Sequence, residues 1–288
     1  MTIPRSHNVR VEGRTVGVYE YGDPDGSPVF VFHGTPACGV GFAWADGPAR
    51  ERGLRLIAPD RPGVGHSERR PDWTVAEYAA QVTALADALN IESLAVCGYS
   101  GGGPYAVACA ALLAQHVTAC AVCAGSGQVG VWAERDDFEK TDKQMLRLAR
   151  TRPWMARLIL GTMALVGRIS PKTAVKSFAS QLSESDRKVI PTLGTPHEQI
   201  ALFTKAFTHG AHGVVADYAA LAQPWGLTVE SIRVPTTIFH GDDDPMVPLR
   251  HSEELAKRVP DAHLVVWPGE GHLGTVTHVG EVLDALKH

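Results

Sequence analysis

Short hydrophobic runs alternate with longer amphipathic segments through the first 125 residues of the chain. Continuous apolar runs, which are typical of strands buried on both faces, occupy residues 29–32, 54–58, 94–97 and 117–122. Between them, residues 75–89 place alanine, valine and leucine on one broad face of a helix. Thr74 and Glu77 have the spacing of a capping box at its start. This alternation predicts an α/β fold with a mostly parallel central sheet and helices on both faces.

The pattern changes between residues 126 and 234. Strand-like runs disappear, and the segment is predicted to be mostly helical, interrupted by Pro153, Pro171, Pro191 and Pro196. The strand pattern returns after Pro235, with strands expected at 236–240 and 263–267 and helices at 249–258 and 276–286. We therefore expect a core made of residues 1–125 and 235–288. Residues 126–234 would form an inserted helical lid.

Composition and charge exclude several classes of function. The chain has 288 residues and a formal net charge of −4, so neither nucleic acid nor an anionic membrane is an expected partner. The longest basic cluster, between Arg147 and Arg157, is broken by apolar residues and is interpreted as the solvated face of a helix. No apolar run reaches the roughly 18 residues of a membrane span, and residues 1–14 do not resemble a signal peptide. We expect a cytoplasmic monomer or homodimer that acts on a small molecule.

The five cysteines do not indicate a metal centre or a disulfide framework. Their number is odd, and Cys97, Cys120 and Cys123 lie in apolar runs, where free cysteine usually behaves as a small buried hydrophobic residue. The C-x-x-C string at Cys120 and Cys123 falls inside a predicted strand rather than at a helix start, which disfavours redox or metal chemistry. The sequence predicts neither a metal site nor a cofactor.

The strongest local signal is the pentapeptide Gly-Tyr-Ser-Gly-Gly at residues 98–102. It follows the predicted strand 94–97 and precedes a predicted helix at 104–114, which is the context of the nucleophile-elbow motif G-x-S-x-G. A serine on such a turn, here Ser100, projects its hydroxyl clear of the sheet. The helix start behind it places N–H groups near a developing oxyanion. The simpler interpretation is a glycine-rich turn that only links strand to helix.

A serine nucleophile needs a base, and the sequence offers 13 histidines. We favour His272, because it lies on a loop after the last predicted strand, at the edge where catalytic groups of open α/β sheets gather. The acid is expected between serine and histidine in the chain. The loop after strand 236–240 supplies three candidates, Asp242, Asp243 and Asp244. His240 is interpreted as structural, and surface or helix positions are expected for His251, His263 and His278.

These motifs, in this order and each at a strand end, resemble the α/β-hydrolase superfamily over residues 9–74, 94–125 and 235–286. The resemblance implies Asp244 as the acid, with Asp242 and Asp243 as loop caps. It also implies that the N–H groups of Thr35 and Gly101 form an oxyanion hole. In the loop His-Gly-Thr-Pro at residues 33–36, the histidine would organise the loop. The segment 60–67, similar to the family's D-x-P-G-x-G-x-S loop, is interpreted as structural.

The implied reaction is hydrolysis of a small or medium carboxylic ester or lactone through an acyl-enzyme, without metal or cofactor. Tyr99, Trp132, Trp154 and Met246 are the predicted substrate-binding residues, although any apolar residue of the lid is more often packed than functional. Family members with the same triad include perhydrolases, carbon–carbon bond hydrolases and proline iminopeptidases. The iminopeptidase loop H-G-G-P is replaced here by H-G-T-P. A ligand sensor that kept the fold is the alternative from another class.

Overall fold

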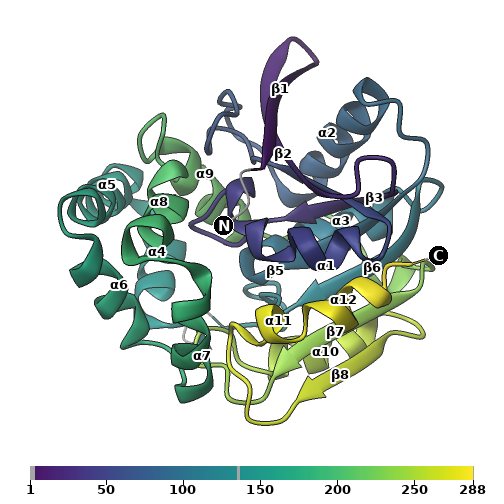
Figure 1. Ribbon diagram of the computed structural model, residues 1–288. Helices are drawn as coiled ribbons and strands as arrows, with labels where there is room; N and C mark the ends of the chain where they lie inside the picture. The colour runs from purple at the N-terminus through teal and green to yellow at the C-terminus, as the bar shows by residue number, and fades with distance from the viewer. Residues whose placement is uncertain (1–3, 135–136, 288) are drawn as a thin grey trace.

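The computed structural model describes residues 4–134 and 137–287. Within these ranges, eight strands form one sheet in the order β1-β2-β4-β3-β5-β6-β7-β8 (Figure 1). The strands are β1 (Arg5–Val11), β2 (Arg14–Gly22), β3 (Ser27–Phe32), β4 (Leu54–Pro59), β5 (Leu94–Tyr99), β6 (Val117–Cys123), β7 (Thr236–Gly241) and β8 (His263–Trp267). β2 pairs antiparallel with β1 and β4, and the other neighbouring strands are parallel. The predicted fold class is confirmed.

Helices cover both faces of the sheet because its central strands carry apolar side chains on both sides. On one face, α1 (Asp46–Arg50) packs against α12 (Val279–Asp284). On the other, α2 (Val75–Ala88) packs against α3 (Gly103–Leu112), and the 3-10 turn η5 (Val229–Ser231) contacts both α3 and α10 (Arg250–Arg258). The capping box predicted at the start of α2 is present.

One element differs from the sequence prediction. The helix expected at 276–286 is two short helices, α11 (Gly274–Thr277) and α12, separated at His278, whose φ is −104° and ψ is 24°. The His278 ring stacks on Trp267 with 4.6 Å between centroids, and its Nε2 atom lies 3.4 Å from a carboxylate oxygen of Glu270. These contacts hold the backbone of His278 outside the helical region. Local sequence periodicity does not reveal them.

Between β6 and β7 the chain forms the helices α4 (Lys140–Thr151), α5 (Pro153–Ile169), α6 (Pro171–Ala179), α7 (Glu184–Val189), α8 (Pro196–Lys205) and α9 (His212–Leu221), with the 3-10 turn η4 (Ile190–Leu193). We call residues 126–234 the helical insertion. Its helices gather on the left in Figure 1. Pro153, Pro171 and Pro196 begin α5, α6 and α8 rather than interrupting a helix, because proline is favoured in the first turn. The end of the insertion returns to the core, where Trp225 accepts a hydrogen bond from the Ala76 N–H.

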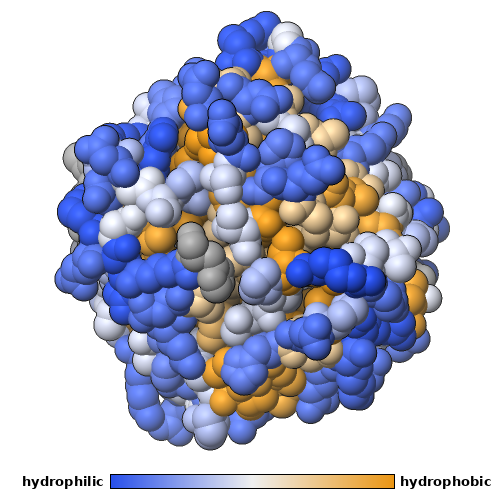
Figure 2. All heavy atoms as spheres, turned by 90° about the vertical axis from the view of Figure 1, so that its right-hand side faces the viewer, coloured by the Kyte–Doolittle hydropathy of each residue, from blue (hydrophilic) through white to orange (hydrophobic). Residues whose placement is uncertain are grey.

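The side of the molecule away from these helices mixes hydrophilic residues with smaller hydrophobic areas (Figure 2). All five cysteines are buried and free. Burial raises the pKa of Cys120 and of Cys123, which lie on β6. In the part of the chain that the structure describes, no helix combines the length and the hydropathy of a membrane span.

Candidate active site

Ser100 stands on a sharp turn between β5 and the 3-10 turn η2 (Ser100–Gly102), which leads directly into α3. Its φ of +54° lies in the left-handed region that non-glycine residues rarely occupy, and such strain is typical of functional turns. The flanking glycines have a steric reason. A Cβ atom on Gly98 would lie 2.4 Å from the Gly102 carbonyl oxygen, and one on Gly102 would lie 2.0 Å from that of Phe32. The turn therefore fits no larger residue at these two positions.

A histidine and an aspartate meet next to this turn. His272 follows β8 and Asp244 follows β7, and the Nδ1–H group of His272 donates to Asp244 Oδ2 at 2.7 Å. The other carboxylate oxygen of Asp244 accepts the N–H groups of Met246 and Val247, at 2.8 and 3.0 Å, which fixes the orientation of the carboxylate. Of the three candidate aspartates, Asp244 is the one that contacts the histidine.

The other two candidate acids, Asp242 and Asp243, make hydrogen bonds that connect their loop to the histidine loop. The Asp242 side chain accepts the Gly269 N–H at 2.6 Å, and the backbone N–H of Asp243 donates to the Glu270 carbonyl at 2.9 Å. His240, at the end of β7, bonds the Ser252 hydroxyl and the Val247 carbonyl, and its Nε2 atom lies 3.3 Å from Asp244 Oδ2. His251 lies on helix α10 as expected, but it is buried, where it accepts the Gly127 N–H at 3.2 Å.

Electrostatics favours an ionised aspartate beside a basic imidazole. Burial alone would raise the pKa of Asp244, but the charges and hydrogen bonds of His272 and His240 lower that pKa well below its usual value. Burial would lower the pKa of His272. The charge and hydrogen bond of the Asp244 carboxylate outweigh the effect of burial, so the pKa of His272 is raised. Asp186 and Asp142 contribute in the same direction. His272 therefore has the enhanced proton affinity that a general base needs.

Tyr99 connects the serine turn to the histidine loop. Its ring centroid lies 5.1 Å from that of His272, and its hydroxyl donates to the His272 carbonyl at 3.2 Å. Among the described residues, Ser100 Oγ makes no hydrogen bond with His272. In unliganded enzymes this bond is often long and tightens when substrate binds.

Thr35, which follows β3, lies directly against Gly101. A Cβ atom on Gly101 would be 2.6 Å from Thr35 Oγ1 and 3.1 Å from the Thr35 backbone nitrogen. The Thr35 hydroxyl donates to Asp217 at 2.6 Å and accepts from the Arg61 guanidinium at 2.9 Å. Arg61 and Asp217 are both fully buried, and they pair at 2.7 Å. Helix α9, which carries Asp217, thus holds the loop after β3 through a buried ion pair.

The loop after β3 has further internal support. Arg61 donates to the carbonyl groups of His33 and Gly34, and the Arg61 N–H donates to His33 Nε2 at 3.3 Å. Burial lowers the pKa of His33 well below its ordinary value, so the ring is neutral and bridges backbone groups. In the neighbouring segment 60–67, the buried Asp60 accepts the N–H groups of Gly39 and His66.

Comparison with known proteins shows the family to which the chain belongs. The α/β hydrolase fold family matches residues 27–279, which is most of the chain. The chain belongs to this family. The chain is 26% identical over 259 residues to the 2-hydroxymuconate semialdehyde hydrolase of Pseudomonas putida, covering 88% of this chain and 83% of that relative.

Two solved structures superpose over almost the whole chain. A thermophilic esterase from Thermogutta terrifontis has a TM-score of 0.70 at 21% identity, covering 98% of this chain and 96% of that one. A bromoperoxidase from Bacillus anthracis has a TM-score of 0.73 at 17% identity, covering 98% of both chains. At these identities the structural likeness shows the fold alone.

The structure has a contact at the histidine loop that the sequence did not suggest. Asp186, on helix α7 of the insertion, is fully buried and accepts the backbone N–H groups of His272 at 3.0 Å and Leu273 at 2.6 Å. The same carboxylate lies against Gly271, where a Cβ atom would come within 2.3 Å of it. Ser183 and Asp186 also form a capping box at the start of α7. That local motif is the only sequence signal, and it does not indicate a contact with the core.

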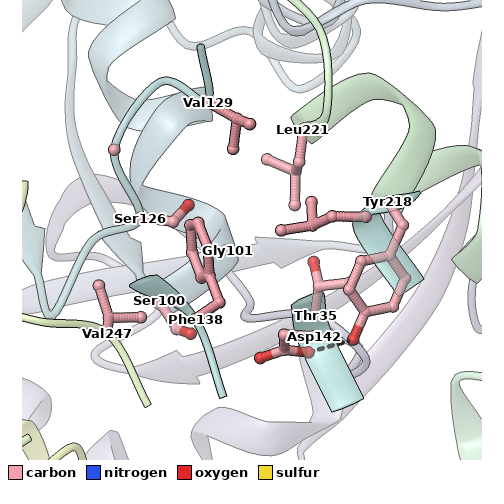
Figure 3. A pocket seen from close by; sticks show the side chains of 12 residues that line it. Thr35, Ser100, Gly101, Ser126, Val129, Phe138, Asp142, Tyr218, Leu221 and Val247 are labelled. Carbon is pink, nitrogen blue, oxygen red and sulfur yellow. Dashed lines mark hydrogen bonds between the residues drawn. The ribbon is translucent and has the colours of Figure 1, made fainter. Parts of the chain in front are cut away.

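A pocket of about 380 Å³, part of it open to solvent, lies over the serine turn (Figure 3). It is lined by residues of the core and of the insertion, namely Thr35, Ser100, Gly101, Ser126, Gly127, Val129, Phe138, Asp142, Leu146, Tyr218, Leu221 and Val247. The lining is largely apolar, with one carboxylate at Asp142. The Tyr218 hydroxyl donates to that carboxylate at 2.6 Å (Figure 3). Burial raises the pKa of Asp142 to about 6.

The four predicted substrate-binding residues lie outside this lining. Trp154 is 60% exposed on helix α5. Trp132 packs edge-on against the buried Trp225 and under Arg258, so its ring covers part of the hydrophobic core. Tyr99 contacts His272 instead, and Val247 lines the pocket where Met246 was expected. Hydrophobicity alone did not show which residues face the cavity. Within residues 4–134 and 137–287, no group of His, Cys, Asp or Glu is arranged to hold a metal ion.

Proposed function

We propose that this α/β hydrolase is a serine hydrolase that cleaves small or medium carboxylic esters or lactones through an acyl-enzyme on Ser100. The observation that carries the proposal is the 2.7 Å hydrogen bond between His272 and Asp244 beside a strained serine turn. A nucleophile, an acid and a base in this chain order, each at the carboxyl end of a strand, form the constellation needed for acyl transfer.

In the first half of the reaction, Ser100 Oγ attacks the substrate carbonyl carbon and His272 Nε2 takes the serine proton. Asp244 holds the imidazole in the tautomer whose Nδ1 carries hydrogen, and it stabilises the imidazolium that forms. The tetrahedral oxyanion would accept the N–H groups of Thr35 and Gly101, which lie against each other. Each such donor typically contributes about 3 kcal/mol to the transition state.

In the second half, His272 gives its proton to the leaving alkoxide, and the alcohol departs. A water molecule then attacks the acyl carbon while His272 accepts one of its protons. Collapse of this second tetrahedral intermediate breaks the bond to Ser100 Oγ, which recovers its proton from His272 and releases the carboxylic acid. The aspartate stays ionised throughout, in keeping with the lowered pKa of Asp244.

The pocket supports a compact substrate. Its twelve lining residues enclose a small space between the serine turn and the helical insertion, and part of that space is open to solvent. Phe138, Leu146 and Leu221 supply apolar contact area for an acyl or alcohol chain, and all three come from the helical insertion. We propose that the insertion acts as a lid that selects the substrate.

The test is hydrolysis of p-nitrophenyl acetate, butyrate, octanoate and laurate by the wild type and by Ser100→Ala and His272→Ala. We expect turnover that is fastest for the short chains and that falls at least 1,000-fold in both variants, about the size of effect known for this type of triad. Wild-type turnover that survives in Ser100→Ala would remove this serine from the reaction.

A carbon–carbon bond hydrolase is the second candidate, favoured by the 26% identical relative from Pseudomonas putida. The same triad would serve this reaction. Incubation with 2-hydroxymuconate semialdehyde separates the two. Turnover of that compound at least 100-fold above turnover of butyrate esters would place it first, and ester turnover alone would leave the esterase proposal in place.

A further inference from the structure

Helix α5 exposes an unusual amount of apolar surface. Of the ten large hydrophobic side chains that are exposed among the described residues, seven lie on α5 and α6. Ile169 is 74% exposed, Leu158 64%, Trp154 60% and Leu165 53%. The predominance of one helix pair shows a concentrated patch rather than the scattered apolar residues of an ordinary surface.

The four most exposed of these residues share one face of α5. At 100° per residue, Trp154, Leu158, Leu165 and Ile169 fall within an arc of about 60°. We call these four residues the α5 ridge. The opposite side of the helix, including Leu160, is buried against the rest of the insertion. Helix α5 is therefore apolar on its packed side and on its free side. Packing within this chain explains the apolar residues of the packed side but not those of the free side.

The segment of the chain that contains the ridge carries charge of one sign. From residue 143 to 183 the sequence contains eight Lys and Arg and no Asp or Glu, whereas the rest of the chain has 19 Lys and Arg against all 31 Asp and Glu. Arg157 and Arg168 lie on α5, and Lys172 and Lys176 lie on α6. Across the described parts of the chain, none of these four pairs with a carboxylate. We call Arg157, Arg168, Lys172 and Lys176 the cationic rim, because they lie on the helix that carries the ridge and on α6, which contacts it, in a protein that is otherwise acidic.

We propose that the α5 ridge and its cationic rim dock the protein on an anionic lipid surface, with α5 lying in the plane of the interface. Interfacial helices insert Trp and Leu into the headgroup region and carry Lys or Arg beside them, and α5 has both kinds of residue on or next to its free face. Anionic headgroups complement the rim, whereas a second copy of this chain would bring two cationic rims together. Arg147 and Arg150 on α4 are exposed, as expected for a solvated helix face, so the proposal rests on α5 and α6 and departs only from the expectation that an anionic membrane is not a partner.

Docking would hold the insertion against the membrane. Helix α4, which contacts α5, contributes Asp142 and Leu146 to the pocket, so a helix that lines the pocket would lie next to the docked helix. The docking proposal does not depend on the reaction at Ser100, because lipid binding is measured without turnover.

The experiment is sedimentation with sucrose-loaded vesicles of phosphatidylcholine alone and of phosphatidylcholine with 30% phosphatidylglycerol. We expect at least tenfold stronger binding of the wild type to the anionic vesicles, and a loss of most of that binding in 0.5 M NaCl. The double variant Leu158→Glu/Ile169→Glu should bind at least tenfold more weakly, and Lys172→Gln/Lys176→Gln about tenfold more weakly. Leu112→Glu is the matched control, because Leu112 is 48% exposed at the end of α3, outside the patch.

Three results would overturn the proposal. The first is equal binding of the wild type to neutral and anionic vesicles, and the second is a loss of binding in Leu112→Glu as large as in the ridge variant. The third is a wild-type dimer in analytical ultracentrifugation that the ridge variant dissociates, since the patch would then be a contact between two copies of the chain. All the substituted side chains are exposed, so we expect the variants to fold as the wild type does. Far-UV circular dichroism and thermal unfolding that match the wild type check this.

Discussion

Asp186 on α7 is the contact through which the insertion holds the histidine loop, and Asp186→Asn tests its role. In the wild type one carboxylate oxygen accepts the Leu273 N–H, and the other accepts the N–H groups of His272 and Ser183. An asparagine has one acceptor oxygen. If that oxygen keeps the Leu273 bond, the side-chain amide meets the His272 N–H donor to donor. The shape is nearly unchanged, so the perturbation is electrostatic.

The expected size of the effect follows from these bonds. Loss of a buried, charge-assisted hydrogen bond costs about 2 kcal/mol, which for a chain of this length lowers the thermal midpoint by about 5 °C. A shift of the His272 backbone by a fraction of an ångström would lower kcat/KM by about 10- to 100-fold. The variant also removes a negative charge that helps to raise the pKa of His272, so that pKa falls.

The pH profile separates positioning from simple destabilisation. Only neutral His272 can accept the serine proton, so activity is lost as pH falls through the raised pKa of His272. In Asp186→Asn the acid limb of kcat/KM should move to lower pH, and the variant should keep a larger fraction of its own maximum at pH 6. Glu184→Gln is the control, because Glu184 lies on the same helix and pairs with Lys188 at the surface. Wild-type kcat/KM with an unshifted acid limb in Asp186→Asn would refute the reasoning.

Three further predictions concern the site itself. Asp244→Asn should lower kcat of ester hydrolysis by about 10⁴-fold, because the His272 tautomer is no longer fixed, and a loss below tenfold would contradict Asp244 as the acid. Asp142→Asn should raise kcat/KM for monoethyl succinate relative to ethyl butyrate at pH 8. The pKa of Asp142 is about 6, so at pH 8 its carboxylate is ionised and repels an anionic substrate. An unchanged ratio of the two kcat/KM values argues against contact between Asp142 and the substrate. Gly101→Ala should reduce kcat about 100-fold, because its Cβ would press on Thr35 and displace the oxyanion donors, whereas wild-type kcat would place the oxyanion elsewhere.

The elements of the core could be predicted because their signals are local. The buried strands are continuous apolar runs, and the turn at Ser100 is a motif whose glycines are required by contacts with their immediate surroundings. The choice of Asp244 among three neighbouring aspartates needed the family resemblance. Its hydrogen bond with His272 joins two loops that are far apart in the sequence.

The contributions of the insertion could not be predicted, because they depend on how its helices pack. Ser183 and Asp186 have the same type of capping-box spacing as Thr74 and Glu77, yet only the first pair also contacts another loop. Trp154 illustrates the converse case. Helix α5 is apolar on nearly all sides, so its periodicity does not show whether a tryptophan faces the pocket, the core or the surface.

Intact-mass spectrometry after incubation with a fluorophosphonate tests most directly whether Ser100 is the nucleophile. We expect one adduct on the wild type, mapped to Ser100 by peptide analysis, slower labelling of His272→Ala and no adduct on Ser100→Ala. A wild-type chain that stays unlabelled, or a label that maps to another residue and persists in Ser100→Ala, would contradict it.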